Sequence, residues 1–191
     1  MDTQDLSQAQ LEKSSAILAA ARAHFAKQGF EATRLSEVAR DAGVAVGTIY
    51  LRYAGKAELL AGVLGDVEQS FCNAMDTDDI WATPFPERFT KITLAIVDEA
   101  AKAPDLAELM ALASYAPKTA HQAMLPKIEA HIRDGVARGA LREDIDPGLA
   151  AQMAHGVMEG AMRALMAPNA PDPEAVVAHV ADAYGRWLVN T

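Results

Sequence analysis

The chain has 191 residues, 51% of them hydrophobic, so it is long enough for one or two small domains with a real core. Its net charge of −9 argues against a nucleic-acid binder unless the positive charge is concentrated in one part. Cys72 is the only cysteine, which excludes an intrachain disulfide and favours a reducing compartment. No apolar run approaches the ~18 residues that span a bilayer, and the N-terminus lacks the basic and apolar regions of a signal peptide. We therefore expect a soluble, cytoplasmic protein.

Apolar residues recur at helical spacing and strand-like alternation is missing, so the sequence predicts an all-α fold. The first predicted helix covers about residues 11–28. Its buried stripe consists of Ile17, Leu18, Ala21 and Phe25. Gly29 is expected to end this helix, because glycine readily adopts the left-handed backbone of a helix C-terminus. Thr33 then stands at the expected N-cap of the next helix.

Residues 34–53 form two short predicted helices hinged at a glycine. The apolar face of the first is Leu35, Val38, Ala39 and Ala42. Gly43 supplies the left-handed turn, and the second helix follows with Ile49 and Tyr53 pointing inward. Helix, glycine turn and helix at this spacing describe a helix-turn-helix, whose second helix reads the major groove of DNA. The expected core of the region is Ile17, Phe25, Phe30, Val38, Val44, Ile49 and Tyr53.

The charge distribution supports this interpretation. Residues 13–60 hold seven Lys and Arg against four Asp and Glu, a net charge of +3. Residues 61–191 hold ten against nineteen, a net charge of −9. The excess positive charge therefore lies on the candidate DNA-binding part, whereas the acidic remainder would be repelled by the duplex.

Further motifs flank the helix-turn-helix. Upstream stands Ile17-Leu18-x-x-Ala21-x-x-x-Phe25-x-x-x-Gly29-Phe30-x-x-Thr33, and downstream stands Gly47-Thr48-Ile49-Tyr50-x-x-Tyr53-x-x-Lys56-x-x-Leu59-Leu60. With these motifs, residues 13–64 resemble the N-terminal domain of the TetR family of one-component transcriptional regulators. The resemblance implies a three-helix DNA-binding domain and a helical C-terminal domain that binds a ligand and dimerises. It also implies that repression is the usual outcome.

Two side chains are expected to contact the DNA backbone, as the resemblance also implies. Lys56 opens the helix after the motif, where its ammonium and the N-terminal amides can face one phosphate. Tyr50 presents its phenol from the exposed side of the recognition helix. The alternatives are a solvated surface lysine and a packed tyrosine. The full set of DNA-binding candidates is Thr33, Arg34, Val46, Gly47, Thr48, Tyr50, Leu51, Arg52 and Lys56.

The expected recognition surface is unusually apolar. The common family pattern has a serine N-cap and a basic residue where this chain has Ala45 and Val46, and a basic residue where it has Leu51. The missing cap costs roughly 1 kcal/mol of local helix stability. Thymine methyl groups therefore become better targets than guanines, and Arg34 is expected to compensate through a phosphate contact.

Residues 75–86 are rich in prolines and turn formers and mark the expected boundary between a DNA-binding domain at 11–71 and a C-terminal domain at 76–191. A helix over about 56–73 precedes this boundary. The helices predicted after it cover about 87–103, 105–115, 118–138, 147–166 and 173–189. Pro126 is expected to kink or split the third of these.

The last two predicted helices carry the candidate homodimer interface. Gly156, Gly160 and Ala164 recur at every fourth position and let another helix approach closely. The stripe expected beside them on the last helix is Val177, Val180, Tyr184, Trp187 and Leu188. Packing within the chain is the alternative. Two-fold symmetry would place two recognition helices about 34–36 Å apart, facing a palindromic operator.

The remaining helices are expected to enclose an apolar or amphipathic effector. The candidate lining is Trp81, Phe85, Phe89, Met110, Tyr115, His121, Met124, Met158 and Met162. For any single apolar member, plain core is the favoured alternative. Met153 is a further soft side chain of this kind. His155, Glu159 and Arg163 share one helix face and could supply polar contacts, although such rows are usually surface networks.

The sequence supports two other function classes less well. A helical enzyme would need a catalytic or metal-binding motif, and none of the common ones occurs in the sequence. An architectural DNA-binding protein without an effector would not need a separate acidic domain. The sequence therefore predicts a regulator without catalytic residues, cofactor or metal.

Overall fold

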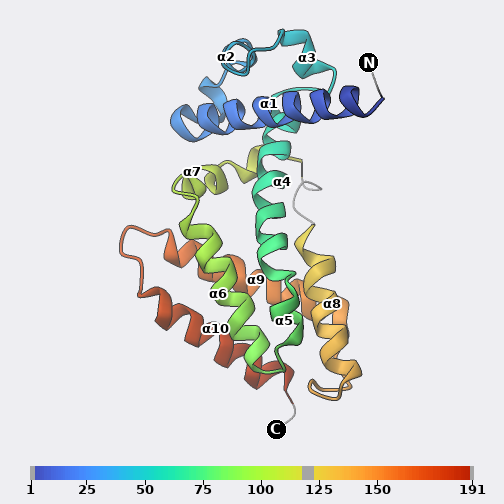
Figure 1. Ribbon diagram of the computed structural model, residues 1–191. Coiled ribbons are helices and arrows are strands. Elements are labelled where there is room, and N and C mark those ends of the chain that lie inside the picture. The colour runs from blue at the N-terminus through green and yellow to red at the C-terminus, as the bar shows by residue number, and fades with distance from the viewer. Residues whose placement is uncertain (1–2, 118–122, 190–191) are drawn as a thin grey trace. The chain divides into compact units, whose positions relative to one another are not determined.

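The computed structural model describes residues 3–117 and 123–189 (Figure 1). These residues form ten α-helices and one 3₁₀ helix, with no strand among them. The helices are α1 (Thr3–Ala32), α2 (Leu35–Asp41), α3 (Val46–Tyr50), α4 (Lys56–Met75), α5 (Asp78–Ala82), α6 (Glu87–Ala101), α7 (Leu106–Ala111), α8 (Met124–Ala137), α9 (Pro147–Leu165) and α10 (Pro173–Leu188). The 3₁₀ helix η1 (Ala113–Tyr115) follows α7. None of the described helices is both long and apolar enough to cross a membrane.

The chain divides into two compact units. The first contains the described residues up to Val67 and those from Asp105 to position 117, and the second contains the other described residues. The division differs from the expected one at two points. The first unit ends after Val67 rather than at 75–86, and it also contains the segment with α7 and η1. Helix α4 spans the boundary in sequence, since its residues up to Val67 belong to the first unit.

In the first unit, α1 packs against α2 and α7, and α2 packs against α3. The side chains without exposed surface include Ile17, Ala21, Phe25, Val38, Ala39 and Ile49. Phe30, Val44 and Tyr53, which were also expected in the core, are only half-buried. Gly43 adopts a φ of 67°, the left-handed conformation that the turn of the helix-turn-helix requires.

The end of α1 differs from the expectation at Thr33. Gly29 breaks the helix with a φ of 77°. Thr33 does not cap α2. Its hydroxyl instead donates to the Gly29 carbonyl at 2.7 Å, and the residue is 2% exposed. The N-cap position of α2 belongs to Arg34, whose side chain makes no capping bond.

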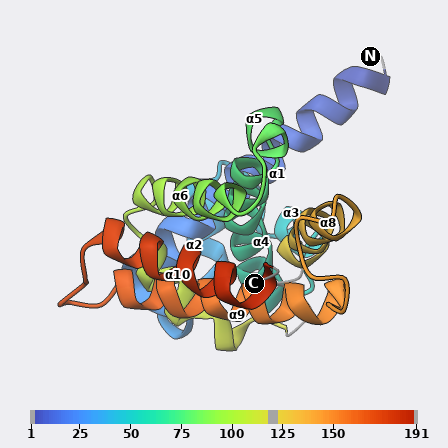
Figure 2. The ribbon, with the colours of Figure 1, turned by 90° about the horizontal axis from the view of Figure 1, so that it is seen from below.

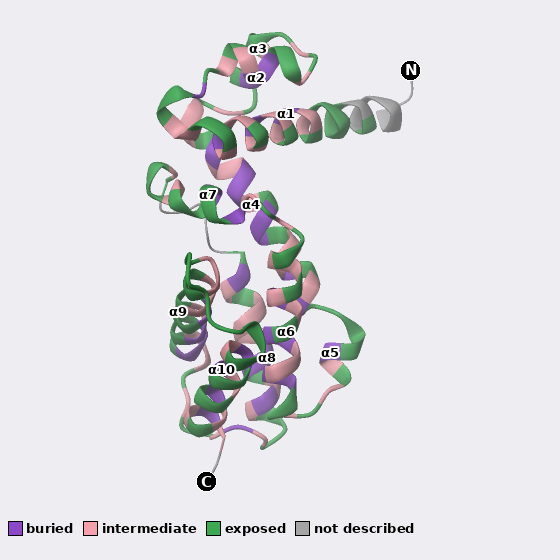
Figure 3. Cartoon of the chain, turned by 90° about the vertical axis from the view of Figure 1, so that its left-hand side faces the viewer, coloured by how far each residue is buried: buried purple, intermediate pink, exposed green. Residues whose placement is uncertain are grey.

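In the second unit, α9 packs against α8 and α10, and α10 also packs against α6 (Figure 2). The buried core of this unit is Cys72, Met75, Ile80, Phe89, Ile92, Ile96, Met124, Ile132, Leu141, Ala150, Ala151, Ala154, Met158, Val180, Tyr184 and Leu188. The Tyr184 hydroxyl donates to the Ala154 carbonyl at 2.8 Å, and burial raises the pKa of this phenol. In Figure 3 buried residues are coloured purple, and they recur along the helices of this unit.

Residues 75–86, where the domain boundary was expected, contain α5, which Thr77 caps by accepting from the Ile80 amide. The expectation for Pro126 is wrong. Pro126 does not kink a helix, because α8 begins at Met124 and so places the proline in its first turn. There a missing N–H leaves no helix bond unmade.

Candidate DNA-binding surface and effector region

The recognition helix α3 presents an apolar surface to solvent. Val46, Tyr50 and Leu51 are 37%, 56% and 87% exposed, whereas Ile49 on the opposite side is fully buried. Ala45 occupies the N-cap position with extended backbone and no side-chain capping bond. The structure therefore shows both the uncapped start and the exposed apolar face that the sequence predicted.

Gly47 lies on the same surface and is open to solvent. A Cβ built on this residue would meet nothing within 4 Å. The packing of the chain therefore does not require glycine at position 47, which leaves close approach by an outside molecule as a reason for the small residue. Thr48 is half-buried beside it.

The cationic candidates differ in how they are held. Arg34 is exposed at the start of α2. Arg52 is also exposed and donates to the Ser14 hydroxyl of α1. Lys56, at the start of α4, donates to the carbonyls of Glu31 at 3.0 Å and Thr33 at 3.2 Å. Since Thr33 itself is buried, only its backbone takes part in this surface.

Ion pairs between helices of the first unit had no signal in the sequence. His24 of α1 lies 2.8 Å from the Asp41 carboxylate at the end of α2, and Arg40 donates to the same carboxylate at 2.9 Å. The hydrogen bonds from Arg40 and His24 lower the pKa of Asp41. The Arg22 guanidinium binds Asp105 through two bonds of 2.7 and 2.6 Å. His24 and Arg22 are remote in sequence from their partners Asp41 and Asp105, whereas Arg40 is the neighbour of Asp41.

The proposed effector lining is divided between the two units. Met110 and Tyr115 belong to the first unit, where they are 36% and 44% exposed. His121 lies outside the described residues. The members in the second unit are Trp81, Phe85, Phe89, Met124, Met158 and Met162. Phe89, Met124 and Met158 are buried in its core, and Phe85 and Met162 pack against that core.

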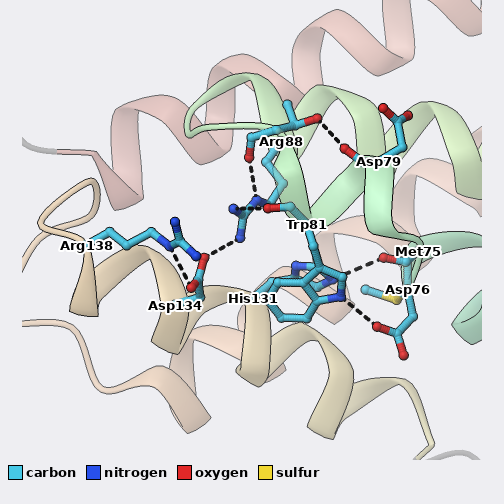
Figure 4. Close-up of polar contacts among 9 residues, drawn as sticks. Met75, Asp76, Asp79, Trp81, Arg88, His131, Asp134 and Arg138 are labelled. Carbon is cyan, nitrogen blue, oxygen red and sulfur yellow. Dashed lines mark hydrogen bonds and ion pairs between the residues drawn. The ribbon is translucent and has the colours of Figure 1, made fainter.

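A polar cluster that the sequence did not predict lies beside Trp81 (Figure 4). The Trp81 indole stacks on the His131 ring with centroids 3.9 Å apart and donates to Asp76 at 2.7 Å. Arg88 is 2% exposed, donates to Asp134 at 2.7 Å and also binds the Trp81 carbonyl at 2.8 Å. The buried guanidinium is therefore paired with charge and with carbonyl oxygen, as a buried cation must be.

His131 is the least satisfied member of this cluster. The residue is 2% exposed, and its Nε2 lies 3.1 Å from the Met75 carbonyl. Its Nδ1 has no hydrogen-bond partner among the described residues. Burial, followed by the charge of Arg88, lowers the pKa of this imidazole, although the Met75 carbonyl opposes the shift. The ring is therefore held neutral, with Nε2 as its donor.

The candidate dimer residues fall into two groups. Gly156, Gly160 and Ala164 lie exposed on α9, so they are accessible to a partner. The α10 stripe, in contrast, is not exposed. Val177, Val180, Tyr184 and Leu188 are at most 5% exposed within the single chain, and Trp187 packs against the same core. The prediction that this stripe faces a partner is wrong, because the chain's own helices cover it.

The outer face of α9 carries further apolar side chains. Leu149, Met153 and Val157 are 57%, 49% and 38% exposed and follow one another at every fourth position. An apolar groove of about 420 Å³ lies beside them, between α9 and α10. Its lining is Val157, Ala161, Pro171, Ala175, Val176, His179, Val180 and Ala183. None of the proposed effector residues lines this groove. His155 is half-buried on α9, and Glu159 and Arg163 are exposed.

Comparison with known proteins decides the family. Residues 17–63 match the bacterial regulatory proteins of the TetR family, and residues 78–188 match the C-terminal domain of BetI-type transcriptional repressors. The chain belongs to the TetR family of transcriptional regulators. It is thus a DNA-binding protein that acts through its helix-turn-helix, in a family of regulators rather than enzymes. No curated protein matches the chain.

Solved structures share this TetR fold. FadR from Bacillus subtilis, in complex with stearoyl-CoA, is 23% identical with a TM-score of 0.71, and the alignment covers 88% of this chain and 95% of that one. The SmeT–triclosan complex is 23% identical with a TM-score of 0.69 and coverage of 93% and 92%. NalD from Pseudomonas aeruginosa, the secondary repressor of the MexAB-OprM multidrug efflux pump, is 20% identical with a TM-score of 0.64 and coverage of 96% and 98%.

Proposed function

We propose that this regulator is a homodimeric repressor that leaves a palindromic operator when an apolar or amphipathic small molecule binds. The observation that carries the proposal is the exposed recognition surface of α3, in the part of the chain that holds its excess positive charge. We assign DNA binding to residues 11–71 and effector binding and dimerisation to residues 76–191. Because the DNA of a bacterial cell lies in its cytoplasm, we expect the protein to act there.

Phosphate anchoring by Lys56 is the first part of the proposal. Its place at the start of α4 lets the ammonium and the helix N-terminus face one phosphate together. We expect Lys56→Ala to weaken binding to all DNA sequences alike and to lower the slope of log K against log salt by about 0.9 for each site lost. Lys27→Ala removes the same charge from an exposed position on α1 and serves as the control. Equal slopes for both variants would remove Lys56 from the interface.

Dimerisation through the outer face of α9 is the second part. The exposed row of Leu149, Met153 and Val157 runs beside Gly156 and Gly160, so a second copy of α9 could approach closely and cover apolar surface. A two-fold axis through such a contact pairs the same face of both copies. It would therefore present two recognition helices to a palindrome.

Gly160→Leu tests this interface without disturbing the fold. A Cβ at position 160 would meet nothing within 4 Å, so the single chain has room for the new side chain, whereas a closely packed partner does not. We expect the variant to sediment as a folded monomer and to lose palindrome binding. Arg133→Leu places the same side chain on the exposed face of α8 and should remain dimeric. A Gly160→Leu dimer with full operator affinity would place the interface elsewhere.

The effector class is supported by the relatives. FadR was solved with stearoyl-CoA and SmeT with triclosan, an amphipathic and an apolar molecule. The aromatic and methionine side chains around Trp81 and Phe89 would suit such ligands. Stearoyl-CoA, triclosan and related apolar compounds should quench or shift the fluorescence of Trp81 and weaken operator binding in the same concentration range. DNA affinity that stays constant across such a panel would instead support a constitutive DNA-binding protein.

A further inference from the structure

We infer that Tyr115 and Phe30 are positioning residues for Lys56, so the segment Asp105–Tyr115 is a working part of the DNA-binding unit. The inference rests on the proposed phosphate contact of Lys56. The sequence placed Tyr115 among the effector contacts. In the structure, however, this tyrosine belongs to the first unit together with α1 and the helix-turn-helix.

Three aromatic rings, those of Phe25, Phe30 and Tyr115, form a stack in the first unit. Phe25 is fully buried in the core, and its ring stacks on Phe30 with centroids 6.0 Å apart and planes 9° apart. Tyr115 stacks on Phe30 in turn, with centroids 4.5 Å apart and planes 15° apart. Phe30 is only half-buried, so Tyr115 covers part of a ring that would otherwise face solvent. The tyrosine therefore fixes the orientation of Phe30 from outside the core.

The Phe30 ring and two backbone carbonyls hold the Lys56 ammonium in place. The Lys56 ammonium lies 4.6 Å from the centroid of the Phe30 ring and donates to the carbonyls of Glu31 and Thr33. An ammonium group has three N–H donors. Within the described part of the chain two of them are used by these carbonyls, which leaves one for a phosphate. Ring and carbonyls together hold the long, flexible side chain in one place before DNA arrives.

An ion pair anchors the segment Asp105–Tyr115 to α1. Arg22 of α1 grips Asp105 through two charge-assisted bonds, and the same pairing lowers the pKa of Asp105. This fork lies at the start of the segment, and the Tyr115 stack lies at its end. Helix α7 packs against α1 between them (Figure 1). The segment is thus fixed to α1 at both ends.

A double-mutant cycle on the full chain tests the inference. Tyr115→Leu should weaken binding to a promoter duplex about two- to fivefold, the range of an exposed cation–π contact. Tyr115→Phe keeps the ring and should retain wild-type affinity. In the Lys56→Ala background, Tyr115→Leu should have no further effect. Ser114→Ala, one residue away and exposed, is the control.

Three results would overturn the inference. Wild-type affinity of Tyr115→Leu would show that the stack does not position Lys56. An equal loss in both backgrounds would show that the tyrosine acts through another route. A wild-type chain that binds no duplex at any salt concentration would overturn the proposed function as well. The wild-type titration in the same series therefore distinguishes the two failures.

Discussion

At the residue scale, the recognition surface has few polar side chains and no capping hydroxyl. The exposed positions of α3 and its exit are mostly apolar, and the hydroxyl that could cap the helix is absent at Ala45. Apolar groups discriminate bases through the thymine methyl, which the major groove presents at each A·T pair. Basic side chains flank this surface, and we expect them to contact phosphates rather than base edges.

Replacing thymine by uracil in the operator tests methyl recognition. If Val46, Thr48 and Leu51 read methyl groups, uracil within the half-sites should weaken binding by about 1 kcal/mol or more in total. The measurement is a competition titration between the two duplexes at constant salt. Uracil substitution between the half-sites is the control and should leave affinity unchanged. Equal affinity for half-site substitutions would show that the apolar surface does not read methyl groups.

The buried imidazole of His131 makes stability depend on pH. Because burial holds its pKa below the ordinary value of 6.5, the unfolded chain takes up the proton first as the pH falls. The stability that depends on a neutral His131 is therefore fully present above about pH 6.5 and is lost as the pH falls below it. Arg88 opposes the imidazolium, whereas Asp76 and Asp134 favour it.

Urea unfolding at pH 7.5 and pH 5.5 measures this effect. We expect the wild-type chain to lose unfolding free energy at the lower pH, and His131→Gln to reduce the difference because glutamine does not titrate. His179→Gln alters an exposed histidine of α10 and should keep the wild-type difference. A difference that is unchanged in His131→Gln would assign the pH dependence to other groups.

At the element scale, the apolar stripes of α9 and α10 illustrate how one pattern can serve two purposes. Helix α9 buries Ala150, Ala151, Ala154 and Met158 and exposes a second apolar row. Helix α10 buries Val177, Val180, Tyr184 and Leu188 of its stripe within the chain. The periodicity of apolar residues shows that a helix face is covered, but it does not show whether the cover comes from the same chain or another.

The glycines of α4 offer a matched pair within one helix. A Cβ on Gly62 would lie 2.9 Å from Tyr53 and 3.1 Å from Leu18, whereas one on Gly65 would meet nothing within 4 Å. Gly65→Ala should therefore raise the unfolding free energy by roughly 0.5–1 kcal/mol. In Gly62→Ala the clash should cancel that gain or reverse it. Thermal unfolding of both variants measures the contrast, and equal gains would show that α4 is not closely packed at Gly62.

At the scale of the whole molecule, the chain does not keep its two units in separate stretches of sequence. It leaves the second unit after α6, contributes α7 and η1 to the first unit, and returns to the second before α8. The proposed DNA-binding and effector functions are therefore connected covalently through this segment as well as through α4. Either connection could carry a change in one unit to the other.

Thermodynamic linkage between effector binding and operator binding gives a test that does not depend on which connection carries the change. If an effector weakens operator binding by some factor, operator DNA must weaken effector binding by the same factor. We expect titration of an active compound with and without operator duplex to show the two equal shifts, and a scrambled duplex to show a smaller one. Identical effector affinity in both titrations would mean that the ligand does not release this protein from DNA.

The sequence by itself determined the local features: the all-helical fold, the helix-turn-helix, the uncapped and apolar start of α3, and the burial of residues such as Ile17 and Phe25. These depend on short-range periodicity and on backbone preferences, which neighbouring residues carry. Only the tertiary structure showed that the α10 stripe is internal, that Thr33 bonds back to Gly29, and that Asp105 and Tyr115 join α1. The contacts of Asp105 and Tyr115 depend on residues far away in the sequence. The cover of the α10 stripe and the bond of Thr33 each depend on a choice between two partners that the local sequence leaves open.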